Sequence, residues 1–148
     1  MSTYTQILYH LVFSTKDRRP VLSDSRREEL YMYMTGVIKN SHCRLVWING
    51  ARDHVHILLS LRPTVALADL VKDIKVASSV WIKDDHIFPN FDAWQDGYGA
   101  FTYSLRDEPE LIAYLKAQEE HHRKTIVLEE YRKLLLDNGI KFEEKYFP

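Results

Sequence analysis

Two histidines and a tyrosine–glutamine pair are the residues of this chain best suited to chemistry. His54 and His56 flank Val55 at the start of an apolar run. Side chains alternate along a β-strand, so both imidazoles leave the same face of the strand expected here. Tyr114 and Gln118 lie four residues apart in a helical pattern and therefore share one helix face. A histidine pair that binds a divalent metal, combined with a phenol and an amide, favours phosphodiester chemistry on DNA.

Each of these side chains has an expected role in that chemistry. The two imidazoles would be metal ligands, and the amide oxygen of Gln118 would be the third. Imidazole suits Mn²⁺ whereas Mg²⁺ prefers oxygen, so we expect Mg²⁺ or Mn²⁺. Tyr114 would attack phosphorus and form a phosphotyrosine bond, which keeps the energy needed for rejoining and requires no nucleotide cofactor. Asp53 would either orient an imidazole or serve only as a turn residue.

Simpler interpretations of the same residues stay open. A His-x-His pair on a strand is often a surface or hydrogen-bonded pair, and a helical Tyr/Gln pair often forms only a local contact. The competing tyrosines are Tyr98, Tyr103 and Tyr131, and the competing histidines are His10, His42, His86, His121 and His122. His10 falls inside an expected strand, which favours a core or sheet-face role, and His42 and His86 are expected at the surface.

The hydrophobic pattern predicts the elements that must position these residues. Strands are expected at 9–13, 44–48, 54–61 and 99–104, and helices are expected to start near residues 25, 64, 107 and 125. This order predicts an α+β fold of the ferredoxin-like, split βαβ type. We expect an antiparallel sheet with helices on one face, and additional C-terminal helices that carry Tyr114. Residues 1–148 are expected to form a single domain.

Local signals set the expected ends of these elements. Ser25 and Glu28 have the spacing of a capping box at the start of the first helix. Asn49-Gly50 predicts the turn of a β-hairpin, because both residues tolerate positive φ. Pro63-Thr64 is expected to end the second strand of that hairpin and to cap the following helix, and Asp107 to cap the third.

Composition limits the possible partners and location. The formal net charge is −1, so contacts to DNA must come from local groups of cations rather than an overall basic field. The candidates are Lys16, Arg18, Arg19, Arg52, Lys72, Lys75 and Arg123. With Cys43 as its single cysteine, the chain cannot form an internal disulfide. The sequence shows neither a secretory signal nor a membrane-spanning run, so we expect a cytoplasmic protein with no membrane partner.

The motifs, taken together, resemble one family. They are YHLVFSTK at 9–16, RRPVL at 18–22, DHVHIL at 53–58, AWQDGYGAF at 93–101 and YLKAQEEHH at 114–122. In this combination and order the chain resembles the HUH-type single-tyrosine transposases of the insertion sequence 200/605 group. The resemblance covers nearly the whole chain.

The resemblance implies a specific activity and assembly. It implies that His54, His56 and Gln118 bind the metal and that Tyr114 is the nucleophile. It also implies a homodimer, in which the tyrosine helix of one subunit can complete the histidine site of the other, and a substrate of single-stranded DNA with hairpin-marked ends. Gly97 and Gly99 would give the backbone freedom for that helix to move.

Two other functions are compatible with the same motifs. A non-catalytic DNA-hairpin-binding protein derived from such a transposase would keep the fold but not the cleavage. A replication- or transfer-type nickase shares the histidine pair, but such enzymes usually belong to longer chains.

Overall fold

The computed structural model describes residues 3–5, 7–103, 109, 112–113 and 116. Tyr114, Gln118 and Arg123 lie outside these residues, as do the competing residues Tyr131, His121 and His122 and the helix expected from 125. The helix expected from 107 is described only at residues 109, 112–113 and 116, which are helical. The predicted roles of these residues, and the assignment of 1–148 to one domain, stay predictions. None of the described helices is long and apolar enough to cross a membrane.

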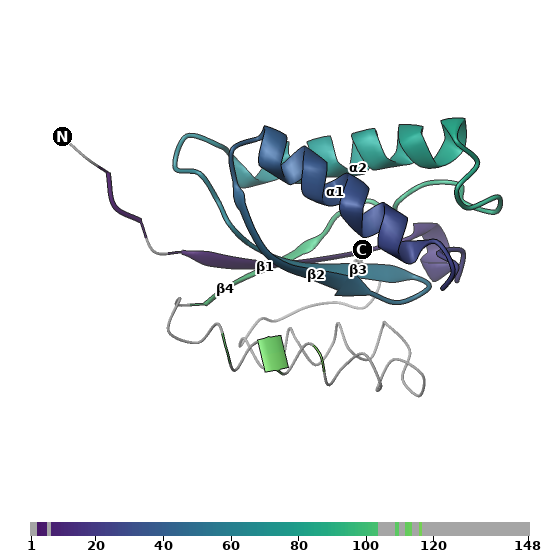
Figure 1. Ribbon diagram of the computed structural model, residues 1–148, viewed down its shortest axis with the longest axis horizontal. Coiled ribbons are helices and arrows are strands. Elements are labelled where there is room, and N and C mark those ends of the chain that lie inside the picture. Colours follow the sequence, from purple (N-terminus) through teal and green to yellow (C-terminus); the bar gives the residue numbers. More distant parts are fainter. Residues whose placement is uncertain (1–2, 6, 104–108, 110–111, 114–115, 117–148) are drawn as a thin grey trace.

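The described elements alternate between strands and helices around one sheet (Figure 1). In chain order they are β1 (Leu8–Ser14), the short 3-10 helix η1 (Lys16–Arg18), α1 (Arg27–Asn40), β2 (Arg44–Gly50), β3 (His54–Ser60), α2 (Leu67–Asp84) and β4 (Gly99–Tyr103). The sheet order is β2-β3-β1-β4, and every neighbouring pair is antiparallel. This is the predicted ferredoxin-like arrangement.

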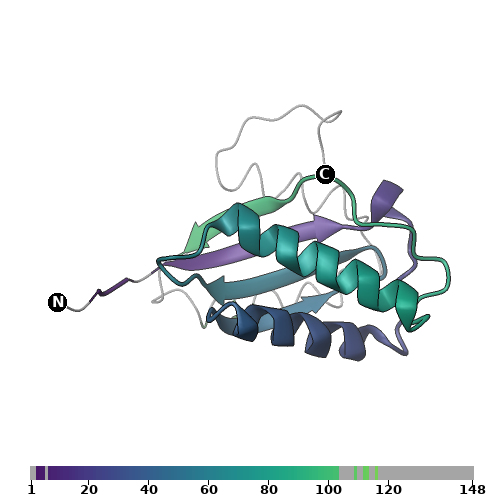
Figure 2. The same cartoon turned by 90° about the horizontal axis from the view of Figure 1, so that it is seen from above.

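The main hydrophobic core lies between the sheet and the two long helices. Figure 2 shows α1 and α2 side by side over the sheet, and the rings of Tyr33 and Trp81 stack between these helices with centroids 4.6 Å apart. The inward face of the central strands is apolar and fully buried, formed by Leu11, Phe13, Val55, Ile57 and Leu59. Alternation along β1 and β3 therefore sends His10, His54 and His56 to the opposite face.

Of the three predicted N-terminal helix caps, the two that fall on described residues were wrong, and Asp107 lies outside the described residues. The first helix begins at Arg27 without a side-chain cap, so Ser25 and Glu28 do not form a capping box. Charged side chains bind one another there instead: Arg26 Nε lies 2.6 Å from Glu29, and Arg27 Nη1 lies 2.6 Å from Asp24. The second helix begins at Leu67 with Ala66 as its N-cap residue, so Thr64 does not cap it either.

The hairpin turn lies three residues later than predicted. Asn49 and Gly50 belong to β2, where Gly50 pairs with Val55. The N–H of Ala51 donates to the carbonyl of His54 at 3.0 Å, which leaves residues 52 and 53 as the loop. A Cβ on Gly50 would come within 2.2 Å of that carbonyl oxygen. The glycine is therefore needed for close approach of two backbones, not for a turn conformation.

Candidate metal centre

The two histidines of β3 lie side by side on the sheet face that α1 and α2 leave uncovered. Their ring centroids are 4.9 Å apart and the rings are nearly perpendicular, at 85°. Both side chains are buried. The strand that carries them is paired with β1 on one side and β2 on the other, so their separation is set by the sheet itself.

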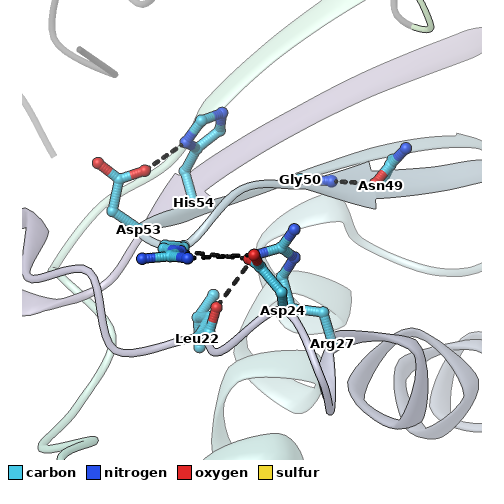
Figure 3. Close-up of polar contacts among 8 residues, drawn as sticks. Leu22, Asp24, Arg27, Asn49, Gly50, Asp53 and His54 are labelled. Carbon is cyan, nitrogen blue, oxygen red and sulfur yellow. Dashed lines mark hydrogen bonds and ion pairs between the residues drawn. The ribbon is translucent and has the colours of Figure 1, made fainter. Parts of the chain in front are cut away.

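Asp53 determines which nitrogen His54 can offer to a ligand. Its Oδ1 lies 2.8 Å from His54 Nδ1 (Figure 3). A carboxylate only accepts hydrogen bonds, so Nδ1 carries the proton, and in the neutral ring the lone pair lies on Nε2. Metal-binding histidines commonly have this arrangement, with the second nitrogen bound to a carboxylate. Asp53 is thus both a turn residue and a hydrogen-bond partner of His54, and its effect on a metal stays a prediction.

The turn that holds Asp53 is tied to the segment after β1. The N–H of Thr15 donates to the carbonyl of Asp53 at 2.9 Å, and the Thr15 hydroxyl lies 3.3 Å from the same oxygen. The N–H of Leu22 donates to the carbonyl of Arg52 at 2.9 Å. Backbone hydrogen bonds of this kind carry no sequence signature, so the role of Thr15 in positioning the turn was not predicted.

A second segment docks at the same place. Lys16 donates its N–H to the carbonyl of Ala93, and Gln95 donates its N–H to the carbonyl of Ser14, both at 2.9 Å. The Gln95 side chain accepts a further bond from the N–H of Asp17. The motifs at 9–22, 53–58 and 93–101, which are far apart in the sequence, therefore meet at this end of β1 and β3.

His10 lies on the sheet face as expected, but its contact was not predicted. Its Nε2 lies 2.9 Å from Nδ1 of His56. The β1–β3 register places His10 opposite Leu58 and Val12 opposite His56, so the contact runs diagonally across the strand pair. His10 is fully buried, and this burial lowers its pKa to about 4, so the ring is neutral at pH 7. No single-sequence signal gives the register that creates this contact.

The described residues would supply only part of the predicted metal site. His54 and His56 fit a divalent cation as two imidazole ligands on a rigid strand. Within the described ranges, no group of three histidine, cysteine, aspartate or glutamate side chains could hold a metal ion. A further donor must therefore be of another type, such as an amide or water, or come from outside these residues. Gln118 would be such a donor.

One described residue links the segment after β4 to this face. Ile112 packs against the small cluster of Leu8 and Leu58, together with Val46, Trp47 and Tyr103. Leu58 lies two residues after His56 on β3 and so shares its face. The short helical segment containing Ile112 lies on the side of the sheet away from α1 and α2 (Figure 1). Two residues before Tyr114, the chain is therefore already on the histidine face.

The competing residues within the described ranges have structural roles. Tyr98 packs against the main core beneath the helices, and Tyr103 packs against the Leu8–Leu58 cluster. His42 and His86 are exposed and follow α1 and α2 in a left-handed conformation, with φ of 59° and 53°. Within the described part of the chain, the neighbours of the histidine pair of β3 are Asp53 and His10 rather than these four side chains.

The candidate DNA-binding cations differ in what already binds them. The ammonium of Lys16 lies 3.4 Å from Asp92, and Arg52 forms a two-nitrogen contact with Asp24. Hydrogen bonds from Arg52 and then Arg27 lower the pKa of Asp24 to about 2. Arg18, another of these candidates, lies in the short helix η1 with a left-handed φ of 55°. In the described structure, exposed Arg19 and Lys72 form no side-chain ion pair, so no described carboxylate neutralises their charges.

Lys75 has an intramolecular function. Its ammonium donates to the carbonyls of Gln95, at 2.9 Å, and Gly97, and it lies 5.4 Å from the centre of the Phe13 ring. Burial lowers its pKa.

The prediction of a flexible backbone at Gly99 was wrong, because this residue is paired with Val12 inside β4. Gly97 has a φ of 85°, but its carbonyl accepts a hydrogen bond from Lys75, and the paired strand β4 lies between Gly97 and residue 114.

Comparison with known proteins gives a consistent result. The family described as "Transposase IS200 like" matches residues 3–118. The ISDra2 transposase TnpA of Deinococcus radiodurans is 25% identical over 120 residues, which is 78% of this chain and 86% of that protein. The transposase for insertion sequence element IS200 of Salmonella typhimurium is 22% identical over 120 residues, 78% of each chain.

Two solved structures share the fold. One is a crystal structure of a Deinococcus radiodurans R1 protein assigned as a transposase, with a TM-score of 0.63 and 26% identity. The similarity covers 80% of this chain and 95% of that one. The other is a REP-associated tyrosine transposase bound to a REP hairpin, with a TM-score of 0.61, 15% identity, and coverage of 82% and 74%.

Proposed function

The chain belongs to the IS200-like transposase family, and we propose that it cleaves and rejoins single-stranded DNA at hairpin-marked element ends through Tyr114 and a divalent metal. The single observation that carries this proposal is the histidine pair of β3. Two buried imidazoles lie 4.9 Å apart on the face that also receives Ile112, two residues before the proposed nucleophile.

The proposed site combines residues of the sheet with residues of the chain after β4. His54 and His56, with Gln118, would hold Mg²⁺ or Mn²⁺, which when bound polarises the phosphoryl group and stabilises negative charge on the leaving oxygen. Asp53 keeps His54 in the tautomer whose Nε2 can bind a cation. Because a free phenol has a pKa of about 10, a neighbouring cation also favours ionisation of Tyr114.

The proposed reaction is a transesterification that balances without a further reactant. The Tyr114 oxygen forms a bond to phosphorus as the bond from phosphorus to the 3′ oxygen breaks. The phenol proton is lost and the departing 3′ oxygen gains one. The product is a 5′-phosphotyrosine, and attack by another 3′ hydroxyl reverses the reaction and rejoins DNA.

The substrate and the assembly are part of the proposal. A structural neighbour holds a REP hairpin, which makes a hairpin oligonucleotide the first substrate to test. With a net charge of −1, recognition must depend on a local set of cations, and exposed Arg19 and Lys72, which form no ion pair among the described residues, are the first of these to test. We further propose a homodimer in which the Tyr114 segment of one subunit can serve the histidine pair of the other.

The test is covalent capture. Wild-type protein, incubated with Mn²⁺ and labelled single-stranded DNA that contains a hairpin and flanking sequence from its own element, should give a protein–DNA adduct stable in SDS. Tyr114→Phe should abolish the adduct and leave hairpin binding intact, because only the hydroxyl is lost. Tyr98→Phe is the matched control, because Tyr98 packs beneath the helices, and it should keep the adduct.

Other outcomes would assign a different function or residue. Hairpin binding by the wild type with no adduct under either metal would favour a non-catalytic hairpin-binding protein. An adduct that persists in Tyr114→Phe but disappears in Tyr103→Phe would move the nucleophile to Tyr103, the other tyrosine near the histidine face.

A further inference from the structure

The two histidines of β3 are held in the same way by different partners. His54 Nδ1 lies 2.8 Å from Asp53, and His56 Nδ1 lies 2.9 Å from Nε2 of His10. In both rings the nitrogen nearer the backbone is already used inside the protein. Both rings therefore have Nε2 as the atom that would bind a shared cation.

The contact between His10 and His56 allows two proton arrangements with opposite consequences. If His10 Nε2 donates, then Nδ1 of His56 is the acceptor and the His56 proton lies on Nε2, which blocks metal binding there. If His56 Nδ1 donates to His10, the lone pair of His56 lies on Nε2 and can bind a cation. Only the second arrangement makes His56 equivalent to His54.

We propose that His10 is a positioning residue that accepts the Nδ1 proton of His56 and so directs the Nε2 lone pair of His56 toward the metal. His10 does for His56 what Asp53 does for His54. The inference rests on the proposed function to the extent that His56 is taken as a metal ligand. It adds a third imidazole to the site, one that touches a ligand rather than the metal.

The surroundings of His10 suit this task. The ring is fully buried and lies beside Phe101 and Tyr103 of β4, with centroids 6.1 and 6.3 Å away, so it has little room to turn. A neutral imidazole can accept a hydrogen bond at Nε2 while it carries its own proton on Nδ1. A carboxylate at this depth would be far more costly to bury.

The arrangement has a cost that a purely structural residue would avoid. When His10 accepts at Nε2, its own proton lies on Nδ1, which is buried and has no hydrogen-bond partner in the described structure. An unsatisfied buried donor is unfavourable, so packing alone gives no reason for histidine here rather than an apolar side chain. A function in orienting His56 gives that reason.

The experiment compares two replacements of His10 in the full chain. Gln places an acceptor near the position of Nε2, whereas Met fills the space without one. Isothermal titration with Mn²⁺ should show affinity ~10- to 100-fold weaker for His10→Met, and close to wild type for His10→Gln. Circular dichroism and thermal unfolding confirm that each variant is folded.

Long-range ¹H–¹⁵N NMR of the metal-free protein reads the tautomer directly, because a cation bound at Nε2 would itself place the proton on Nδ1. The wild type and His10→Gln should show the His56 proton on Nδ1, and His10→Met should lose that preference. Should wild-type His56 carry its proton on Nε2 while His56→Ala still abolishes Mn²⁺ binding, the role of His10 is wrong. Unchanged Mn²⁺ affinity in His10→Met also overturns it.

Failure of the proposed function would look different. If Mn²⁺ binds equally well to the wild type and to His56→Ala, then His56 is not a ligand and the metal assignment itself is wrong. The His10 variants are then not needed to reach that conclusion. Unchanged Mn²⁺ affinity in His56→Ala therefore contradicts the metal assignment. Unchanged Mn²⁺ affinity in His10→Met alone contradicts only the role of His10.

Discussion

The two faces of the central strands β1 and β3 differ in what is buried on them. Beneath α1 and α2, the alternate side chains are all apolar and fill one continuous core. On the other face, three imidazoles are also almost completely buried, those of His10, His54 and His56. Burying a polar ring costs free energy unless its nitrogens are used. The apolar face is therefore explained by folding stability. The three buried imidazoles on the other face are not, and they indicate a function.

The largest expected effects come from substituting two neighbouring residues of β3, one on each face of the sheet. Ile57→Ala should lower the free energy of unfolding by about 2–5 kcal/mol, because it leaves a cavity in the main core. His56→Ala should weaken Mn²⁺ binding at least ~100-fold, because it removes a ligand. Urea denaturation and isothermal titration measure the two effects. Two results would contradict this division of roles between the faces: loss of Mn²⁺ binding in folded Ile57→Ala, or unchanged Mn²⁺ binding in His56→Ala.

A second pair of variants tests whether backbone placement links the hairpin to the metal centre. Gly50→Ala should cost about 1–3 kcal/mol of stability, since the new Cβ would lie 2.2 Å from the His54 carbonyl oxygen. Relief of that clash moves His54, so Mn²⁺ affinity should fall as well.

The matched control for this pair is Gly36→Ala in α1. Nothing lies within 4 Å of a Cβ there, so the substitution should stabilise the helix by about 0.5–1 kcal/mol. Equal stability changes in the two glycine variants would show that the close approach at Gly50 is relieved without cost.

The smallest expected effect separates two lysines of α2. Lys75→Met should lower stability by about 1 kcal/mol, because the ammonium bonds to Gln95 and Gly97 are lost. Lys72→Met should change stability by less than about 0.5 kcal/mol, because Lys72 is exposed. Hairpin affinity, measured by fluorescence anisotropy at several salt concentrations, should fall more for Lys72→Met. A larger loss of hairpin affinity in Lys75→Met than in Lys72→Met would indicate that Lys75, not Lys72, contacts DNA.

Hydrophobic periodicity was sufficient to predict the fold. All four strands and both described helices fall where alternation or helical spacing placed them, and their order gave the ferredoxin-like sheet. Element ends were less predictable, because they depend on competing local contacts. At α1 the ion pairs of Arg26 and Arg27 replaced the capping box, and at the hairpin a close backbone contact explained Gly50.

The candidate site was predictable where it depended on spacing within one element. His54 and His56 share a face because a strand has a period of two. Contacts between elements were not predictable, since they depend on register and docking. His10 meets His56 only because of the β1–β3 register, and Thr15 reaches Asp53 only because the segment after β1 folds back on the hairpin.

Because β3 is hydrogen-bonded to both β1 and β2, its lengthwise position is fixed from two sides. A slip of one residue would turn both imidazoles into the helix-covered layer and expose Val55 and Ile57 in their place, so such a slip is strongly opposed. The cation would then be a stationary reference point within each subunit. Whatever travels during an exchange of DNA ends, whether the nucleic acid or another protein segment, must come to β3 and leave from it.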